Sequence, residues 1–207
     1  MGIKINECDG KIECVSGEKE DAQIHLDFPS VGATENIILA SCISDGKIVT
    51  IGNAAREPEI VDLCDFLIRM GAKITGAGTS FIQITGVKKL KPVSYNIMPD
   101  RIEAGTYLVA GCMTKGDIKI NKVNTEHLKP ILYKLEETGA NIKIEKNSVS
   151  LKMNKRPNKL EIKTLPYPGF PTDMQSIFGS LLTIAKGTST ITENIFENRF
   201  KYARRIN

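Results

Sequence analysis

The sequence predicts an α/β protein built from a repeated unit, with buried helices inside and sheets outside. A short pattern with a glycine at its second position occurs three times, in residues 1–5, 70–74 and 138–142. A glycine just past a helix end adopts the left-handed conformation without steric cost, and the apolar alternation that follows predicts a strand. Three more glycines end apolar segments about 70 residues apart, at Gly46, Gly116 and Gly187. Such a period indicates a repeat architecture.

The predicted unit runs strand, buried helix, strand, surface helix, strand, strand. We expect two whole units, residues 30–98 and 99–170, between two broken ones. Before them, three short strand segments are predicted around Ile3 and Ile5, in 11–15 and in 23–26. Their alternation of apolar and polar residues is typical of strands.

The first whole unit opens with Ser30, a favourable N-cap for the helix that follows. Residues 35–42 are apolar almost without interruption, so we expect this helix to be buried on every side. Gly46 ends it, and 47–51 is a strand. A second helix is predicted over 53–70, with Ile60, Cys64 and Leu67 on one stripe. Gly71 closes that helix, before strands at 73–74 and 80–84.

The later units repeat this plan. Residues 99–101 lead into an apolar helix over 104–113, which Gly116 ends before a strand at 118–120. An amphipathic helix is predicted over 126–138, and strands over 142–144 and 149–153. Its apolar stripe is Leu128, Ile131, Leu132 and Leu135. The third unit starts at 171–173, is apolar over 177–185, and continues with a strand at 188–192 and a surface helix from 193 to 207.

Composition narrows the class of protein. The net charge of +4 is spread along the chain, which does not indicate nucleic-acid binding. No apolar run approaches the roughly 20 residues of a membrane helix, and the opening residues show no signal-peptide pattern. The five cysteines form no metal-binding or disulfide pattern, and Cys42, Cys64 and Cys112 lie in apolar segments where buried thiols are expected. A reducing cytoplasm fits best.

Ser30, Asp100 and Asp173 stand at the same place in three units, at the start of an apolar helix. One interpretation is N-capping, which satisfies free backbone N–H groups without any function. The other is that several positive helix ends point at one cleft and bind an anion. Spacing alone favours capping.

Asp173 differs because three prolines precede it within residues 166–171. Proline fixes φ, so this loop is expected to be rigid. A rigid loop that presents a carboxylate suits a general base. The alternative, a stiff linker before an acidic helix start, is equally compatible with these residues.

Five segments resemble motifs of the UDP-N-acetylglucosamine enolpyruvyltransferases (1-carboxyvinyltransferases), a family related to EPSP synthase. They occur in the family's order and cover nearly the whole chain. The segments are Asp27–Asn36, Asn53–Asp62, Pro99–Thr106, Phe170–Gln175 and Glu197–Phe200.

The resemblance implies an inside-out α/β barrel fold with two similar domains, each of three units, and an active site between them. It implies transfer of enolpyruvate from phosphoenolpyruvate to the 3-hydroxyl of UDP-N-acetylglucosamine, with release of phosphate. This is the first committed step of peptidoglycan synthesis, and the family uses neither a metal nor a cofactor.

Site residues carried over by motif follow from the same resemblance. Asp173 corresponds to the base at the sugar hydroxyl, and Ile195 to a further contact with the UDP-sugar. The remaining substrate contacts are Phe28, Pro29, Ser30 and Val31, and the weaker cleft-lining assignments are Asp100, Arg101, Glu197 and Arg199. Some members have Lys where Phe28 stands, so the resemblance does not extend to a charged contact there.

The family's reactive-cysteine loop and several anion-binding arginines would lie upstream of Met1, and another arginine downstream of Asn207. We therefore expect parts of two domains, 1–95 and 96–207, that need the missing parts of the same enzyme and are inactive alone. Two alternatives stay open: a truncated module that binds UDP-sugar without chemistry, and a structural repeat protein.

Overall fold

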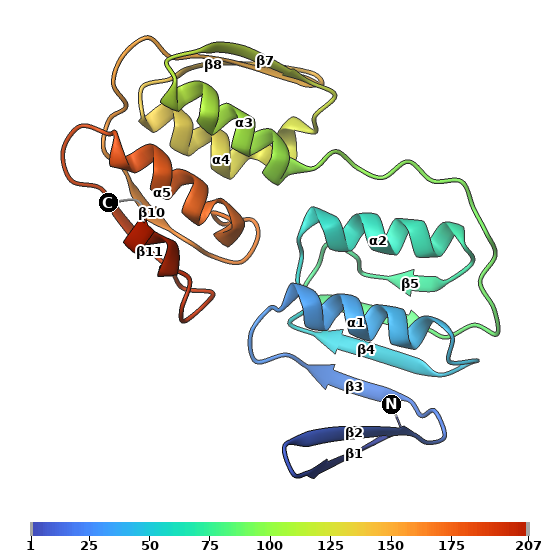
Figure 1. The fold of residues 1–207 in the computed structure, drawn as a ribbon. Helices are drawn as coiled ribbons and strands as arrows, with labels where there is room; N and C mark the ends of the chain where they lie inside the picture. Colours follow the sequence, from blue (N-terminus) through green and yellow to red (C-terminus); the bar gives the residue numbers. More distant parts are fainter. Residues whose placement is uncertain (1, 206–207) are drawn as a thin grey trace. The chain divides into compact units, whose positions relative to one another are not determined.

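A computed structural model describes residues 2–205 of the chain. The fold divides into two compact units, Met1–Ile97 and Met98–Asn207. Each unit is a mixed α/β body in which helices lie against open sheets (Figure 1). The predicted α/β class is confirmed.

The first unit holds one main sheet in the order β3-β4-β6-β5, in which β3 pairs with β4 in parallel and the other pairs are antiparallel. Its elements are β1 Ile3–Cys8, β2 Lys11–Ser16, β3 Ala22–His25, α1 Val31–Cys42, β4 Ile48–Gly52, α2 Pro58–Arg69, β5 Lys73–Thr75 and β6 Phe81–Thr85. Alternate residues of the central strands, such as Ile51 and Ile82, are fully buried in one cluster with residues of α1 and α2. One face of the sheet is thus covered by the two helices.

Helix α2 shows the predicted stripe, because Ile60, Cys64 and Leu67 are all buried. It begins at Pro58, however, and the predicted start at residue 53 is wrong. Asn53 has a positive φ of 55°, which interrupts any helix there, and proline is favoured in the first turn.

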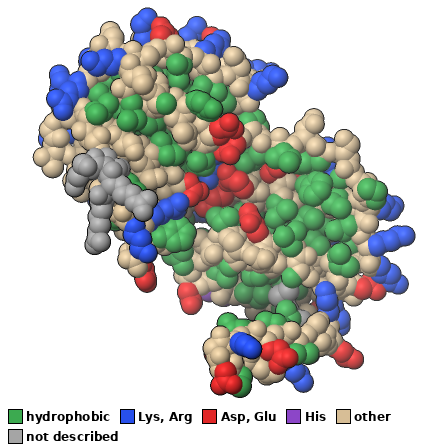
Figure 2. Space-filling view, viewed as in Figure 1, with side chains coloured by type: hydrophobic (Ala, Val, Ile, Leu, Met, Phe, Trp, Pro, Cys, Tyr) green, Lys and Arg blue, Asp and Glu red, His purple; other side chains and the backbone are tan. Residues whose placement is uncertain are grey.

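Helix α1 is not buried on every side, so that prediction is wrong. Ile38 is fully buried, whereas Leu39 is 50% exposed and Ile43, just after the helix, is 54% exposed. Within this unit α1 packs against β4, β6 and α2, and Leu39 lies on a side of α1 that these elements leave exposed. Figure 2 shows hydrophobic side chains gathered on the face of the unit where α1 and α2 lie.

The second unit contains a three-stranded antiparallel sheet, β7-β9-β8, and a parallel pair, β10-β11. Its elements are α3 Arg101–Met113, β7 Asp117–Asn121, α4 Thr125–Glu137, β8 Asn141–Glu145, β9 Ser148–Lys152, β10 Glu161–Lys163, the 3₁₀ helix η1 Thr172–Met174, α5 Gln175–Thr183, β11 Thr190–Thr192 and the 3₁₀ helix η2 Lys201–Arg205. Helix α3 packs against both α4 and α5. The predicted stripe of α4 is fully inside this core.

The sheet topology confirms the internal repeat. The order β4-β6-β5 in the first unit equals β7-β9-β8 in the second, and the parallel pair β3-β4 around α1 equals β10-β11 around α5. Strand β10 was not predicted, because it has only three residues and Ile162 is the one apolar residue among them. Strand β11 is shorter than predicted and begins at Thr190.

Left-handed residues end the helices as expected, with φ of 74° at Gly46, 104° at Gly71 and 89° at Gly139. After α3 this conformation falls on Lys115, with φ 54°, and not on Gly116. The predicted surface helix over 193–207 is also wrong. Residues 197–200 form a turn, and only the 3₁₀ helix η2 follows; residues 206–207 lie outside the described part.

Among the described residues, no helix has both the length and the apolar character needed to cross a membrane.

Truncating the core face of α4 should destabilise the second unit. Ile131 is fully buried, so Ile131→Ala should lower the free energy of unfolding by about 2–5 kcal/mol through lost burial and a cavity. Tyr133 on the opposite face is 60% exposed, and Tyr133→Ala should change it by only about 0.5 kcal/mol. Urea denaturation of both variants checks this; equal losses would contradict the packing described.

Candidate active site

In the first unit, the predicted substrate contacts Phe28–Val31 lie between the end of β3 and the first residue of α1. Ser30 is the N-cap of α1, and its Oγ accepts a hydrogen bond of 3.2 Å from the Ala33 backbone N–H. Phe28 is 45% exposed. The loop therefore has a fixed backbone end and an accessible aromatic ring.

Thr34 joins this loop to the second predicted motif. Its hydroxyl is fully buried, donates to the Ser30 carbonyl over 2.7 Å and accepts from the Ala55 N–H over 3.1 Å. The Asn53 side-chain amide donates to the Leu26 carbonyl over 2.8 Å. Residues 27–36 and 53–62, which are separated in sequence, are thus held side by side.

Acidic side chains gather at the same end of α1 and α2. Partial burial raises the pKa of the Glu35 carboxyl, and the neighbouring carboxylates of Glu59 and Glu57 raise it further. Like charges brought together in this way disfavour the ionised form.

In the second unit, the Asp100 carboxylate is the N-cap of α3. Its Oδ1 accepts from the N–H groups of Ile102, at 2.7 Å, and Glu103, at 3.0 Å. The next residue, Arg101, is 6% exposed, and its guanidinium lies 5.7 Å from the centre of the Tyr167 ring. The hydrogen bonds of the Asp100 carboxylate are therefore those of a helix N-cap, as the capping interpretation predicts.

Asp173 lies at the start of the third apolar helix, as predicted, but it is not a helix cap, so the capping interpretation is wrong for this residue. It lies inside η1, whose N-cap is Pro171, and α5 begins two residues later without a side-chain cap. Its Oδ1 accepts from Arg199 Nη2 at 2.7 Å. The Asp173 side chain stays 57% exposed, so the carboxylate is anchored at one oxygen and open to ligands.

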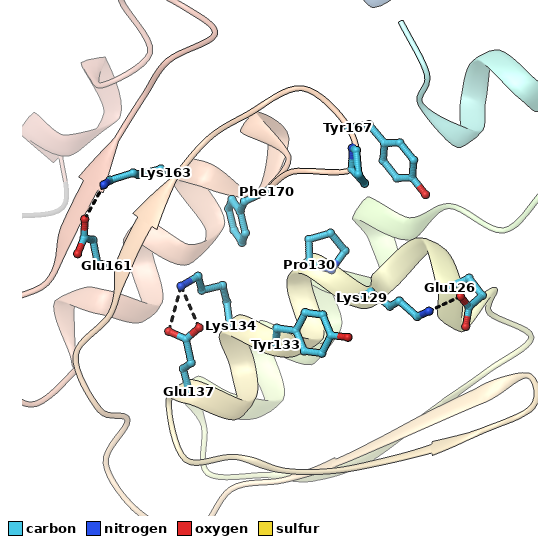
Figure 3. Close-up of a pocket in the computed structure, with 11 residues that line it drawn as sticks. Glu126, Lys129, Pro130, Tyr133, Lys134, Glu137, Glu161, Lys163, Tyr167 and Phe170 are labelled. Carbon is cyan, nitrogen blue, oxygen red and sulfur yellow. Dashed lines mark hydrogen bonds and ion pairs between the residues drawn. The ribbon is translucent and has the colours of Figure 1, made fainter. Parts of the chain in front are cut away.

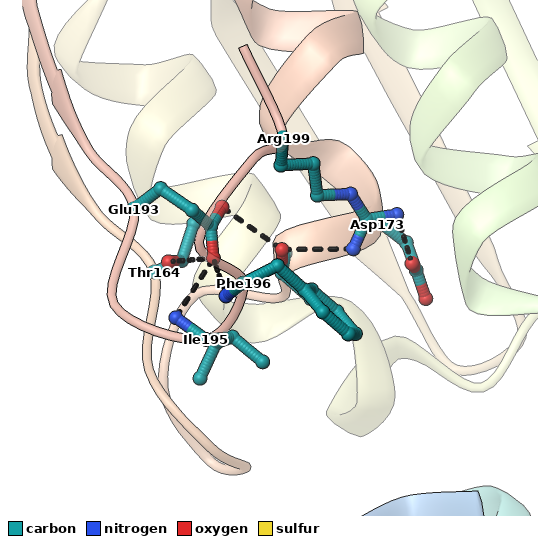
Figure 4. A network of polar contacts seen from close by, with 7 residues as sticks. Thr164, Asp173, Glu193, Ile195, Phe196 and Arg199 are labelled. Carbon is teal, nitrogen blue, oxygen red and sulfur yellow. Dashed lines mark hydrogen bonds and ion pairs between the residues drawn. The ribbon is translucent and has the colours of Figure 1, made fainter. Parts of the chain in front are cut away.

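Arg199 connects Asp173 to a larger polar network (Figure 4). Its Nη1 donates to Thr172 Oγ1 over 2.9 Å, and its guanidinium lies 4.9 Å from the centre of the Phe196 ring. Thr172 in turn donates to Glu193 Oε2 over 2.9 Å. Residues from η1 and from the segment after β11 are therefore joined.

Glu193 is the centre of this network. Its Oε1 accepts from the Thr164 hydroxyl and the Ile195 N–H, both at 2.9 Å, and from the Phe196 N–H at 3.2 Å. Burial raises the pKa of Glu193, but these bonds and that from Thr172 together lower it below its ordinary value of 4.5. The carboxylate is therefore ionised and fully used as an acceptor.

Three predicted site residues of the second unit are thus brought together: Asp173, Ile195 and Arg199. Ile195 is half-buried with its N–H fixed by Glu193, while Glu197 is exposed in the turn 197–200. Sequence reasoning missed Glu193 and Thr164. One signal in the sequence could have indicated Glu193. It directly follows a predicted strand and stands two residues before the candidate contact Ile195, and carboxylates in such positions often accept hydrogen bonds from nearby backbone N–H groups.

A large hollow of the second unit lies elsewhere. It measures about 980 Å³ and is lined by α4, β10 and the loop at Tyr167 (Figure 3). None of the predicted site residues lines it, and each of its lysines forms an ion pair with a nearby glutamate. The pairs are Lys129 with Glu126, Lys134 with Glu137, and Lys163 with Glu161. The paired charges leave no cation for an anionic substrate, so we do not place the site there.

Cys42, Cys64 and Cys112 are buried, as predicted, and burial raises the pKa of the Cys64 thiol to about 12. Such thiols are inert as nucleophiles. Within residues 2–205, no cluster of three His, Cys, Asp or Glu side chains is placed to hold a metal ion.

Comparison with known sequences gives consistent matches. The family model for EPSP synthase (3-phosphoshikimate 1-carboxyvinyltransferase) matches residues 1–207. A UDP-N-acetylglucosamine 1-carboxyvinyltransferase 2 from Caldanaerobacter subterraneus is 53% identical over 100% of this chain, which covers 49% of that protein. A UDP-N-acetylglucosamine 1-carboxyvinyltransferase from Ruthia magnifica is 55% identical over 98% of this chain, which covers 48% of it. The chain spans about half the length of the curated relatives it matches.

Solved structures share the fold. The enolpyruvyl transferase NikO from Streptomyces tendae superposes with a TM-score of 0.86 at 22% identity, over 99% of this chain and 51% of that one. EPSP synthase from Acinetobacter baumannii gives a TM-score of 0.61 at 19% identity, over 92% of this chain and 45% of that one. At these identities the likeness concerns the fold alone.

Replacing the central acceptor should destabilise the second unit in a pH-dependent way. Glu193→Gln introduces N–H donors where only acceptors fit, so we expect a Tm several degrees lower at pH 7. Because the pKa of folded Glu193 lies below 4.5, its contribution is present above pH 4.5 and lost as the pH falls through the folded pKa. Calorimetric Tm values should therefore converge in acid. A constant difference at all pH values would contradict this.

Glu35→Gln should have the opposite sign. The pKa of Glu35 is raised in the folded state, so its ionised form destabilises the first unit at neutral pH. The variant should have a higher Tm at pH 7, and the gain should vanish as the pH falls below the ordinary pKa of 4.5. Scans of both proteins between pH 3 and pH 8 check this (a range set by the ordinary carboxyl pKa); a lower Tm at pH 7 would refute the repulsion among the carboxylates.

Proposed function

Since the chain belongs to the EPSP synthase (3-phosphoshikimate 1-carboxyvinyltransferase) family, we propose that it forms part of an enzyme that transfers enolpyruvate from phosphoenolpyruvate to the 3-hydroxyl of UDP-N-acetylglucosamine. This reaction releases phosphate and is the first committed step of peptidoglycan biosynthesis. The choice of acceptor is supported by relatives at 47–55% identity, which carry the name UDP-N-acetylglucosamine 1-carboxyvinyltransferase.

The observation that carries the proposal is the state of the Asp173 carboxylate. One oxygen is held by Arg199 at 2.7 Å, and the other oxygen makes no hydrogen bond within the described residues. An exposed carboxylate with a fixed orientation suits a general base, because it can accept a proton in one defined direction.

In the proposed reaction Asp173 takes the proton of the sugar 3-hydroxyl, and the hydroxyl oxygen forms a bond to C2 of phosphoenolpyruvate. C3 gains a proton, which gives a tetrahedral intermediate. Loss of a C3 proton and departure of phosphate then form the enolpyruvyl ether. The guanidinium of Arg199 is a cation beside the base, and it suits the stabilisation of negative charge that develops on the substrates.

The other site residues keep the roles that the family implies. Phe28, Pro29, Ser30 and Val31 contact the UDP-sugar from the capped loop of the first unit, and Ile195 contacts it from the segment that Glu193 holds. Asp100, Arg101 and Glu197 line the substrate cleft. Fixed backbone positions at both sets of contacts support these assignments, because binding then costs little ordering entropy.

We further propose that residues 1–95 and 96–207 are parts of two domains of this enzyme, and that the remaining parts complete them. The chain covers about half of its relatives, and α1 leaves a hydrophobic side uncovered in its unit. A cytoplasmic location is proposed because the substrates are intracellular metabolites.

The test combines the chain with the part of the Caldanaerobacter subterraneus relative that lies outside the matched region. Phosphate release in the presence of both substrates is expected from the mixture and not from the chain alone. Calorimetry with UDP-N-acetylglucosamine separates the alternatives. Binding without phosphate release would favour a binding module, and absence of both would favour a structural repeat protein.

Asp173→Asn in the active mixture should lower phosphate release by roughly 100-fold or more, because the base is lost. The Tm should change little, since the side chain is half-exposed and caps no helix. Asp117→Asn is the matched control, as Asp117 forms only a surface ion pair with Lys152. Normal turnover per folded molecule in Asp173→Asn would remove it as the base.

A further inference from the structure

The segment that connects the two units has no regular secondary structure (Figure 1). Strand β6 ends at Thr85 and α3 begins at Arg101, so residues 86–100 form this connection. Fully extended, such a path spans roughly 50 Å, at about 3.5 Å per residue. A free connection of this length would join the two units only loosely. Its contacts decide how much of it is free.

The first part of the connection is bound to the first unit. The Val87 N–H donates to the Cys42 carbonyl at the end of α1 over 2.9 Å. The Lys91 N–H donates to the Met70 carbonyl, just after α2, over 2.8 Å. Leu90, between these two residues, is half-buried against the apolar core of the unit. The connection is therefore fixed as far as Lys91.

Tyr95 attaches the connection a second time, to one face of α2. Its hydroxyl donates to Asp62 Oδ1 over 2.9 Å and lies 3.2 Å from the Asp62 carbonyl oxygen. The Tyr95 ring centre is 5.3 Å from that of Phe66, and the Arg69 guanidinium lies 5.1 Å from the Tyr95 ring centre. Asp62, Phe66 and Arg69 are spaced by four and three residues, so they share one face of the helix. Tyr95 thus contacts two successive turns of α2.

The three contacts of Tyr95 differ in kind and support one another. Partial burial raises the pKa of the Tyr95 hydroxyl above its ordinary value of 10, and the hydrogen bond to Asp62 raises it further. The hydroxyl is therefore protonated at neutral pH and remains a donor to the carboxylate. The tilted ring pair with Phe66 and the cation above the ring are favourable contacts of their own. Together they hold one side chain in one orientation.

After Tyr95 the connection is next fixed at Asp100. The Asp100 carboxylate caps α3, as described above, and so belongs to the second unit. Between these two points, residues 96–99 make no hydrogen bond or ion pair within the described chain, and Ile97 is 81% exposed. The extended path from Tyr95 to Asp100 is roughly 18 Å, about a third of that of the whole connection.

We propose that Tyr95 anchors the connection to α2 and thereby confines the hinge between the two units to residues 96–99. Without this anchor the hinge would begin after Lys91 and include residues 92–99, twice the length. The end-to-end distance of a flexible chain then grows roughly 1.4-fold, with the square root of its length. The inference goes beyond the proposed function and does not rest on it. For an enzyme with substrate contacts in both units, a short hinge raises the effective concentration of one set near the other.

The test is NMR relaxation of the backbone N–H groups in the intact 207-residue chain. Residues 93–98 all carry an N–H, so order parameters can be measured on both sides of Tyr95. We expect about 0.85, typical of rigid backbone, at residues 93–95 and less than about 0.6 at residues 96–98. In Tyr95→Ala, values below about 0.6 should extend back to Val93. Tyr133→Ala is the matched control, because it removes a 60% exposed tyrosine from α4 and should keep the parent profile.

Order that is lost after Tyr95 in the parent chain, and already at Val93 in Tyr95→Ala, supports the inference. Uniform order parameters over residues 93–98 in the parent chain overturn it. An unchanged profile in Tyr95→Ala, or an equal loss of order in Tyr133→Ala, also overturns it. Rigid amides in β4, whose Ile51 is fully buried, verify that each variant is folded. No substrate takes part in this measurement, so its outcome does not depend on the proposed transfer reaction.

Discussion

The candidate site of the second unit depends on one carboxylate, that of Glu193. It accepts hydrogen bonds from the Thr164 and Thr172 hydroxyls and from the Ile195 and Phe196 N–H groups. These donors come from the end of β10, from η1 and from the segment after β11. The carboxylate therefore ties η1 to the ends of the paired strands β10 and β11. Since Thr172 also binds Arg199, the orientation of the Arg199–Asp173 ion pair depends on it too.

A second constraint shapes each unit: an open sheet must bury one face, and two helices supply the cover. The sheets β4-β6-β5 and β7-β9-β8 both have this cover, and Ile51, Ile82, Ile84 and Leu151 in them are fully buried. The β1–β2 hairpin has the same register without the cover. The need to cover one sheet face thus explains both the buried cores and the exposed isoleucines of the β1–β2 hairpin. Helix α1 likewise leaves an apolar side chain exposed, that of Leu39.

Local signals in the sequence predicted much of the fold. The sequence predicted the left-handed glycines that follow helices and the buried apolar stripes of α2 and α4, because these features depend only on neighbouring residues. Interactions between distant residues were not. Glu193 has its hydroxyl partners 21 and 29 residues away, β10 has only three residues, and the left-handed turn after α3 falls on Lys115 although Gly116 is adjacent. The proline-rich loop made Asp173 a candidate and the family resemblance gave its role, whereas its pairing with Arg199 required the structure.

Amide hydrogen exchange at Ile195 and Phe196 tests the organising role of Glu193 most directly. Neither N–H belongs to a helix or strand, so their protection depends on the Glu193 carboxylate. The structure predicts that both exchange more slowly than the amides of the exposed turn 197–200, and that Glu193→Gln removes this difference. Exchange of both at the rate of the turn in the parent chain would contradict the network and the orientation of Asp173 that follows from it.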